Sequence, residues 1–354
     1  MRRSITPLIV VLVLQLALAG GLLVRRDPLA GARTDTPLLQ PGVAQRADQI
    51  VIEAGPAAAA AAGAAAAAPS SGAGASPAPA PAPARIVLRK KDGIWVLPDD
   101  YDVPADTPKV SSLLDRLAAL KRGLPIATSD SALKRFKLVD SDFERRLILN
   151  ADGKTIDTVY FGSSPGLRKS DARTADERAV YAVDLPTYEL PTDVSAWLSA
   201  DLLKPDATKL AEIDVAGGAR DSFQLVRQKG SDKQPDSWSD PALKGDQRID
   251  SAHVESLAEQ IAALHVDAVL GTAAKPEWQQ DHPLVTLTLK DDKSQSAQWA
   301  LSKPASGDFY VLKSSIHPWF FSISATAGKS LIDASGRDAL IVASKPLQVP
   351  AGKS

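Results

Sequence analysis

One string in this chain has the spacing of a catalytic motif. Gly162-Ser163-Ser164-Pro165-Gly166 fits G-x-S-x-G, in which a serine nucleophile sits on a strained turn between a strand and a helix. The chemistry would be acyl transfer, and it would need a histidine and an acid brought close by the fold. Pro165 biases Ser164 toward extended geometry, and the residues after Gly166 are charged and loop-like. We therefore predict a turn between two strands, and keep a serine hydrolase that uses Ser164 as an alternative.

Histidines and carboxylates are the other groups that could hold a metal. No two histidines stand four residues apart, the spacing that puts two ligands on one helix face. We expect His253 on a helix surface and His265 at a helix end. The acidic residues after Trp95 lack the spacing and turn glycine of a calcium loop, so a solvated loop with one helix N-cap is predicted. The candidate metal ligands by residue type are His253, His265, His282, His317, Asp99, Asp100, Asp102 and Asp106.

Two tryptophans, Trp95 and Trp238, could offer flat apolar faces to a ligand. Each is expected on a strand beside a helix, which favours a place in the core. We therefore assign no catalytic, cofactor-binding or metal-binding residue.

Charge and cysteine content exclude several classes of protein. Lys plus Arg number 41 against 42 Asp plus Glu, and no basic block stands outside the N-terminus, so nucleic acid is not an expected partner. The chain has no cysteine, which removes disulfides, thiol nucleophiles and zinc knuckles together.

Residues 5–24 form an apolar run flanked by arginines, long enough to cross a hydrocarbon core of about 30 Å. A signal peptide cleaved after Ala19 is the competing interpretation, but Leu22, Leu23 and Val24 carry the apolar run past that site. The flanking charges favour a cytoplasmic N-terminus. We predict a single-pass bacterial inner-membrane protein with its bulk in the periplasm.

The second half of the chain repeats the pattern of the first. Ile50–Gly55 matches Ile213–Gly218, and Ile86–Lys91 matches Phe223–Gln228. Helix positions agree at one offset, Val110 with Val254 and Leu120 with Leu264. Further matches pair Leu147 and Leu149 with Leu287 and Leu289, Val159 with Trp299, and Tyr181 with Tyr310, which leaves residues 168–177 as an insertion without a counterpart.

The Ala/Pro tract at residues 57–84 has almost no side chain to bury, so we predict that it is disordered. It could be a stalk between membrane and domain. The repeat places it instead inside the first hairpin of copy one, because Ile50–Gly55 on its far side already belongs to the folded unit.

The predicted fold class is α+β: an N-terminal transmembrane helix, then two tandem copies of an antiparallel sheet with a packed helix. The helices are expected from Asp106 or Thr107 to Gly123 and from Asp250 to about His265, and residues 193–203 are expected to form a short helix. The predicted segments are a cytoplasmic tip and anchor (1–26), a short linker (27–45), a first repeat (46–205), a second repeat (206–342) and a flexible tail (343–354).

The chain resembles a bacterial envelope family known only as domain of unknown function 4340. The likeness covers residues 45–205 well and 210–340 more faintly. It rests on Asp92-Gly93-Ile94-Trp95, Pro104-Ala105-Asp106, Phe136-Lys137-Leu138, Tyr160-Phe161-Gly162, Tyr181-Ala182-Val183-Asp184, Trp197-Leu198 and Asp201-Leu202-Leu203.

The resemblance implies a single-pass envelope protein, often encoded beside ABC-type exporters of the gliding-motility sort, and it offers no catalytic residues to carry over. The expected function is therefore a non-catalytic accessory or interaction subunit of a transport or envelope complex. The alternatives are the serine hydrolase and a binding module for a cell-wall glycan or lipid.

Overall fold

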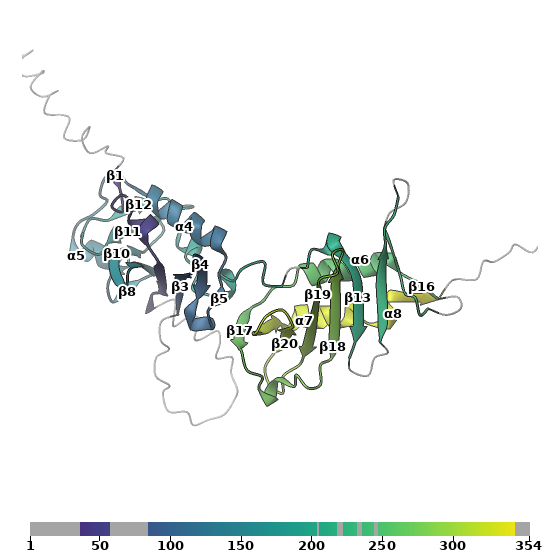
Figure 1. Ribbon diagram of the computed structural model, residues 1–354. Helices are drawn as coiled ribbons and strands as arrows, with labels where there is room; N and C mark the ends of the chain where they lie inside the picture. The colour runs from purple at the N-terminus through teal and green to yellow at the C-terminus, as the bar shows by residue number, and fades with distance from the viewer. Residues whose placement is uncertain are drawn as a thin grey trace, which may run out of the picture. The chain divides into compact units, whose positions relative to one another are not determined.

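The computed structural model describes residues 36–56, 84–203, 205–217, 222–231, 236–243 and 247–343 (Figure 1). The fold is mostly antiparallel sheet with a few helices, which agrees with the predicted α+β class. There are two sheets of eight strands within the described residues. Contacts divide the described chain into a first unit, residues 36–90 with 108–193, and a second unit, residues 91–107 with 194–343.

The first sheet has the strand order β12-β11-β10-β9-β2-β3-β4-β5. Its inner face is apolar, and Ile50, Leu149 and Val159 are completely buried there. Its strands are β2 (Gln49–Ala54), β3 (Arg85–Lys91), β4 (Ile94–Leu97), β5 (Val103–Pro104), β9 (Arg145–Ala151), β10 (Lys154–Phe161), β11 (Ser170–Thr174) and β12 (Tyr181–Val183). The elements around it are β1 (Thr36–Pro37), α2 (Val43–Arg46), α4 (Thr107–Ala119), β6 (Lys121–Arg122), α5 (Asp130–Arg135), β7 (Leu138–Val139) and β8 (Asp142–Phe143).

The second sheet has the order β15-β14-β13-β18-β19-β20-β21-β17. Its strands are β13 (Leu210–Ala216), β14 (Phe223–Gln228), β15 (Ser237–Ser239), β17 (Ala268–Gly271), β18 (Val285–Asp291), β19 (Ser296–Ser302), β20 (Phe309–Ser314) and β21 (Phe320–Ser324). With it come α6 (Ser251–Ala262), α7 (Ala325–Ala334), α8 (Arg337–Leu340) and the pair β16 (Gln247–Ile249) and β22 (Ile341–Ala343). Short 3-10 turns occupy Pro98–Asp100, Thr187–Glu189, Val194–Ala196, Ala207–Lys209 and Pro276–Trp278.

The internal repeat is confirmed by strand order and register. The series β12-β11-β10-β9-β2-β3-β4 of the first sheet has the same connectivity as β21-β20-β19-β18-β13-β14-β15 of the second. Ile50 pairs with Leu149, and the matching Ile213 pairs with Leu289. The same agreement holds for Val159 with Leu147 and Trp299 with Leu287, and for Leu88 with Ile50 and Leu225 with Ile213.

One part of the sequence alignment is wrong. Sheet order puts β11 in the place of β20, so residues 168–177 are not an insertion, and Tyr181 corresponds to Phe321 instead of Tyr310. The sequence pattern conceals this strand because Ser170–Thr174 is polar, although all five residues are buried. Ser170 Oγ donates to the Leu185 carbonyl, and the Arg173 guanidinium donates to the Leu138 carbonyl and Asp140. The buried Oδ1 of Asp171 has no hydrogen-bond partner in the described part of the chain.

The Ala/Pro tract leaves the first sheet between two paired strands. β2 pairs with β3 from Gln49–Arg89 to Glu53–Arg85, so the tract connects the two strands of a hairpin, as the repeat predicts. β2 also pairs with β9, which makes it an internal strand. The tract itself, residues 57–83, lies outside the described residues.

The predicted linker at 27–45 is packed over its described part. Leu38, Leu39 and Val43 are at most 3% exposed, and β1 pairs with β6. The same pairing ends α4 at Ala119 instead of Gly123, because the chain continues into β6.

Other helix predictions agree in part. Asp250 caps α6 as predicted, because its Oδ1 accepts from the amides of Ala252 and His253. The short helix predicted at 193–203 is reduced to a 3-10 turn at Val194–Ala196. Ala343, placed in the tail by sequence, pairs with Gln247 in β22–β16.

Within the described ranges, no helix is long and apolar enough to span a bilayer. The predicted anchor at residues 5–24 and the tail after Ala343 lie outside those ranges.

Candidate functional site

Ser164 lies in the loop between β10 and β11, a connection from strand to strand as predicted. Its Oγ lies 2.7 Å from the carbonyl oxygens of Gly166 and Lys169, so the hydroxyl is used to shape the loop. Packing explains the glycine at position 162, because a Cβ there would come within 1.9 Å of the Phe136 carbonyl oxygen. The G-x-S-x-G string is thus explained by the geometry of a turn.

The other candidates from the sequence are dispersed. His253 pairs with Asp250 at the start of α6, at 2.8 Å, and Asp102 pairs with Lys91 at 2.9 Å. Over the ranges that the structure describes, no group of three His, Cys, Asp or Glu side chains is placed to hold a metal ion.

Trp95 and Trp238 are buried, at 3% and 5% exposure, as expected for core residues. The Trp238 indole N–H donates to Glu255 of α6 at 3.0 Å, and the Arg227 guanidinium lies over its ring. This tryptophan therefore joins helix to sheet.

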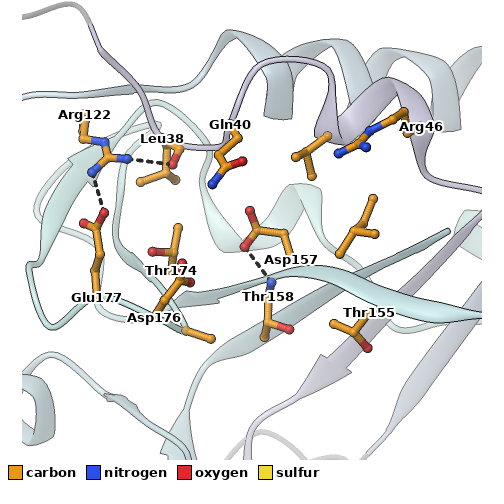
Figure 2. A pocket seen from close by; sticks show the side chains of 13 residues that line it. Leu38, Gln40, Arg46, Arg122, Thr155, Asp157, Thr158, Thr174, Asp176 and Glu177 are labelled. Carbon is orange, nitrogen blue, oxygen red and sulfur yellow. Dashed lines mark hydrogen bonds and ion pairs between the residues drawn. The ribbon is translucent and has the colours of Figure 1, made fainter.

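A polar cavity of about 450 Å³ lies in the first unit, and we call it the first-unit cavity (Figure 2). Four segments form it: residues 38–46 before β2, Arg122 of β6, the start of β10, and the end of β11 with the residues just after it. Figure 2 shows Asp157 rising from β10 toward Gln40, with Arg122 and Arg46 on opposite sides.

One wall of this cavity is an ion pair. The Arg122 guanidinium donates to Glu177 at 2.7 Å and to the Pro37 carbonyl at 3.1 Å, and it lies over the Tyr181 ring. Burial alone would lower the pKa of Arg122, but its bonds with Glu177 raise it overall. Arg122 therefore keeps its positive charge and forms an ion pair with Glu177.

The remaining carboxylates of the cavity have no cation beside them among the residues that the structure describes. Asp157 accepts from the amide of its neighbour Thr158, at 2.7 Å. Burial raises the pKa of Asp157, the Thr158 amide opposes this, and the charges of Asp176 and Glu177 raise it further. Within the described ranges, the side chains of Asp176 and Arg46 have no hydrogen-bond or ion-pair partner.

Asp157 stands on an unusual face of its strand for a charged residue. It pairs with Leu149, and it is two residues from Val159, so alternation directs it to the inner face with these buried side chains. A β-bulge lies between Thr155 and Asp157, where the register shifts. Bulges re-aim side chains and are common beside functional sites.

The second unit has a cavity at the equivalent place, the second-unit cavity, of about 150 Å³. The matching parts of the second repeat line it. These are the segment before β13, the start of β19, and Ile316, which lies two residues after β20. Register makes Ala297 the counterpart of Asp157, because Ala297 pairs with Leu289 as Asp157 pairs with Leu149.

The counterpart of Asp176 in this second cavity is Ile316. The amide of Ala175 donates to Thr158, and the amide of Ser315 donates to Gln298 at the matching position, both at 2.8 Å. Asp176 and Ile316 each follow directly, and each lines its own cavity. The two carboxylates of the first cavity that have no ion-pair partner in the described ranges, Asp157 and Asp176, thus have apolar counterparts in the second.

Neither Asp157 nor Asp176 is among the candidate site residues predicted from the sequence. A signal for Asp157 is present in the sequence, because the alternation of Asp157, Val159 and Phe161 places a carboxylate in phase with two core residues. Asp176 has no such signal, since it follows the strand that the sequence conceals.

Comparison with known proteins gives one match. A family model described as a domain of unknown function (DUF4340) matches residues 95–283, more than half of the 354 residues. No curated protein and no solved structure matches the chain.

Proposed function

Since the chain belongs to the family of the domain of unknown function DUF4340, we propose that it is a non-catalytic cell-envelope protein. In this proposal residues 5–24 anchor it in the bacterial inner membrane, N-terminus inside, and both units lie in the periplasm. It acts there as an accessory or interaction subunit of an ABC-type transport or envelope complex.

The observation that carries the proposal is an apolar segment at the N-terminus followed by a duplicated scaffold. Residues 5–24 are apolar except for Thr6 and Gln15, and arginines flank them on both sides. Each of the two units that follow buries its own apolar side chains in a core. A bilayer is therefore the proposed environment of the apolar run at the N-terminus.

A serine hydrolase that uses Ser164 has weaker support. The single proton of the Ser164 hydroxyl is shared with two carbonyl oxygens of its own loop, each 2.7 Å away. The four histidines of the chain all fall between His253 and His317, in the second repeat. A binding module is compatible with the accessory role, because an interaction subunit can also hold a small ligand.

The test is purification of the tagged full chain from its own cells in mild detergent. We expect it in the membrane fraction, together with an integral membrane transport protein in stoichiometric amount by mass spectrometry. The matched control replaces residues 1–26 with a cleavable signal sequence, and it should be recovered from the soluble periplasm.

Recovery of the unmodified chain in the soluble periplasm would show that cleavage after Ala19 occurs and that no anchor remains. Membrane recovery without a transport protein would contradict the accessory role and leave the anchor standing.

A further inference from the structure

We propose that the first-unit cavity binds a small polar molecule that carries a protonated primary amine, held by the carboxylates of Asp157 and Asp176. This inference rests on the geometry of the first unit and does not depend on the membrane anchor.

The size of the cavity fits a small ligand. Its volume of about 450 Å³ is within the usual range of about 300–1,000 Å³ for small-molecule sites. The lining is mainly polar, so the expected ligand carries hydrogen-bonding groups along much of its surface.

The charges select the kind of ligand. Arg122 and Glu177 form an ion pair, so the remaining charged side chains of the cavity lining are Asp157, Asp176 and Arg46. Arg46 lies at the end of the cavity opposite Arg122. An ionised carboxylate only accepts hydrogen bonds, so two of them require donors from the ligand. A primary ammonium group supplies three N–H donors and a positive charge, which a neutral hydroxyl compound does not.

The repeat shows that the carboxylates are not needed by the scaffold. Ala297 and Ile316 fill the corresponding positions of the second unit, which has the same strands and register. Asp157 places a carboxylate on the inner face of a sheet with no ion-pair partner in the described part of the chain, and such departures from the packing pattern are expected at functional sites. A bound ammonium group would supply the missing charge.

A metal ion fits the same residues less well. Hard cations take six or more oxygen ligands, whereas no group of three acidic or histidine side chains is suitably placed in the described part of the chain. Calcium is therefore included in the test as the competing ligand.

The experiment is isothermal titration calorimetry on the full chain in detergent, with matched probes. Glucosamine is compared with N-acetylglucosamine, whose amine is capped, and phosphoethanolamine with phosphocholine, whose quaternary nitrogen has no N–H donor. Calcium chloride is the fifth probe. We expect saturable binding of at least one primary amine and at least tenfold weaker binding of its counterpart.

Variants tie that binding to the cavity. Asp157→Asn should weaken binding of the amine at least tenfold, and Asp176→Asn should weaken it as well. Asp115→Asn, the same change on an exposed position of α4, should leave the dissociation constant unchanged. Binding to phosphatidylethanolamine and phosphatidylcholine vesicles then shows whether the ammonium group belongs to a lipid or to a free molecule. Preference for phosphatidylethanolamine identifies a lipid headgroup, and no preference identifies a free amine.

Three results would overturn the proposal. They are no saturable binding of either primary amine up to concentrations on the order of 10 mM, equal binding of the capped or quaternary counterparts, and binding that survives Asp157→Asn unchanged. Binding of calcium alone would also overturn it, in favour of a metal site.

Discussion

The first-unit cavity and the second-unit cavity occupy the same place in two copies of one scaffold, and they differ in chemistry. Asp157 and Asp176 line the first, whereas Ala297 and Ile316 line the second. By contrast, the core pair Ile50 with Leu149 in the first copy and its counterpart Ile213 with Leu289 in the second are both apolar. The scaffold is therefore constrained by packing, while the residues at this end of the sheet are free to change with whatever each copy contacts.

The largest effect is expected from removing an internal strand that both copies share. Deletion of residues 47–84 removes β2, which pairs with β3 and β9 and carries Ile50 and Ile52, both completely buried. Loss of these two side chains alone costs about 3–6 kcal/mol. We expect the first unit to lose its cooperative thermal transition, measured by circular dichroism on the full chain.

The control for that deletion keeps both strands. Replacing residues 57–83 with a short Gly-Asn turn preserves the β2–β3 pairing and gives the first hairpin a compact turn. Loop closure changes by only about 0.6 kcal/mol per doubling of loop length, so the melting temperature should stay the same or rise slightly. A stable chain after deletion of 47–84 would show that β2 is dispensable and that the two copies are not equivalent.

Sequence patterns predict the scaffold better than the site, for a physical reason. Strands such as Val285–Asp291 alternate apolar and polar residues, because one face is buried, and this alternation indicates both the existence and the register of the strand. Ser170–Thr174 is buried at every residue although four of its five residues are polar, so it carries no such pattern. The cavity depends on that strand and on the packing of residues 36–46, and neither is visible without the fold.

The next effect comes from giving the second cavity the chemistry of the first. Ala297→Asp introduces a carboxylate on the inner face, two residues from Trp299, which is 1% exposed. An unsatisfied polar group at a partly buried position costs about 1–3 kcal/mol. We expect a lower melting temperature, with faster hydrogen exchange in β18 and β19.

Ala297→Asn separates the charge from the added volume, since it has the size of aspartate without the charge. If it destabilises the chain as much as Ala297→Asp, the second cavity is too small for either side chain and charge is not the difference between the copies. A smaller loss for asparagine at neutral pH, and equal losses below about pH 4, would assign the effect to the carboxylate.

The smallest expected effect is the converse change, Asp157→Asn, in the absence of any ligand. Burial raises the pKa of Asp157 above its ordinary value of 3.8, so the folded state binds its proton more tightly than the unfolded state. Its contribution to stability is therefore fully present below that ordinary value and is lost as pH rises through the raised pKa. Asparagine cannot titrate, so the variant should be slightly more stable than the wild type at neutral pH, by about 0.5 kcal/mol, as is common for partly exposed positions.

Melting temperatures measured for both proteins across the acid range check this expectation. The two curves should converge below the ordinary pKa of 3.8, where the carboxyl of the wild type is protonated in both the folded and the unfolded state. Asp115→Asn, on the exposed face of α4, controls for the general effect of removing one negative charge from the chain. A variant at Asp157 that is less stable than the wild type at neutral pH would mean that Asp157 has a stabilising partner in the free protein, and the first cavity would then be part of the scaffold after all.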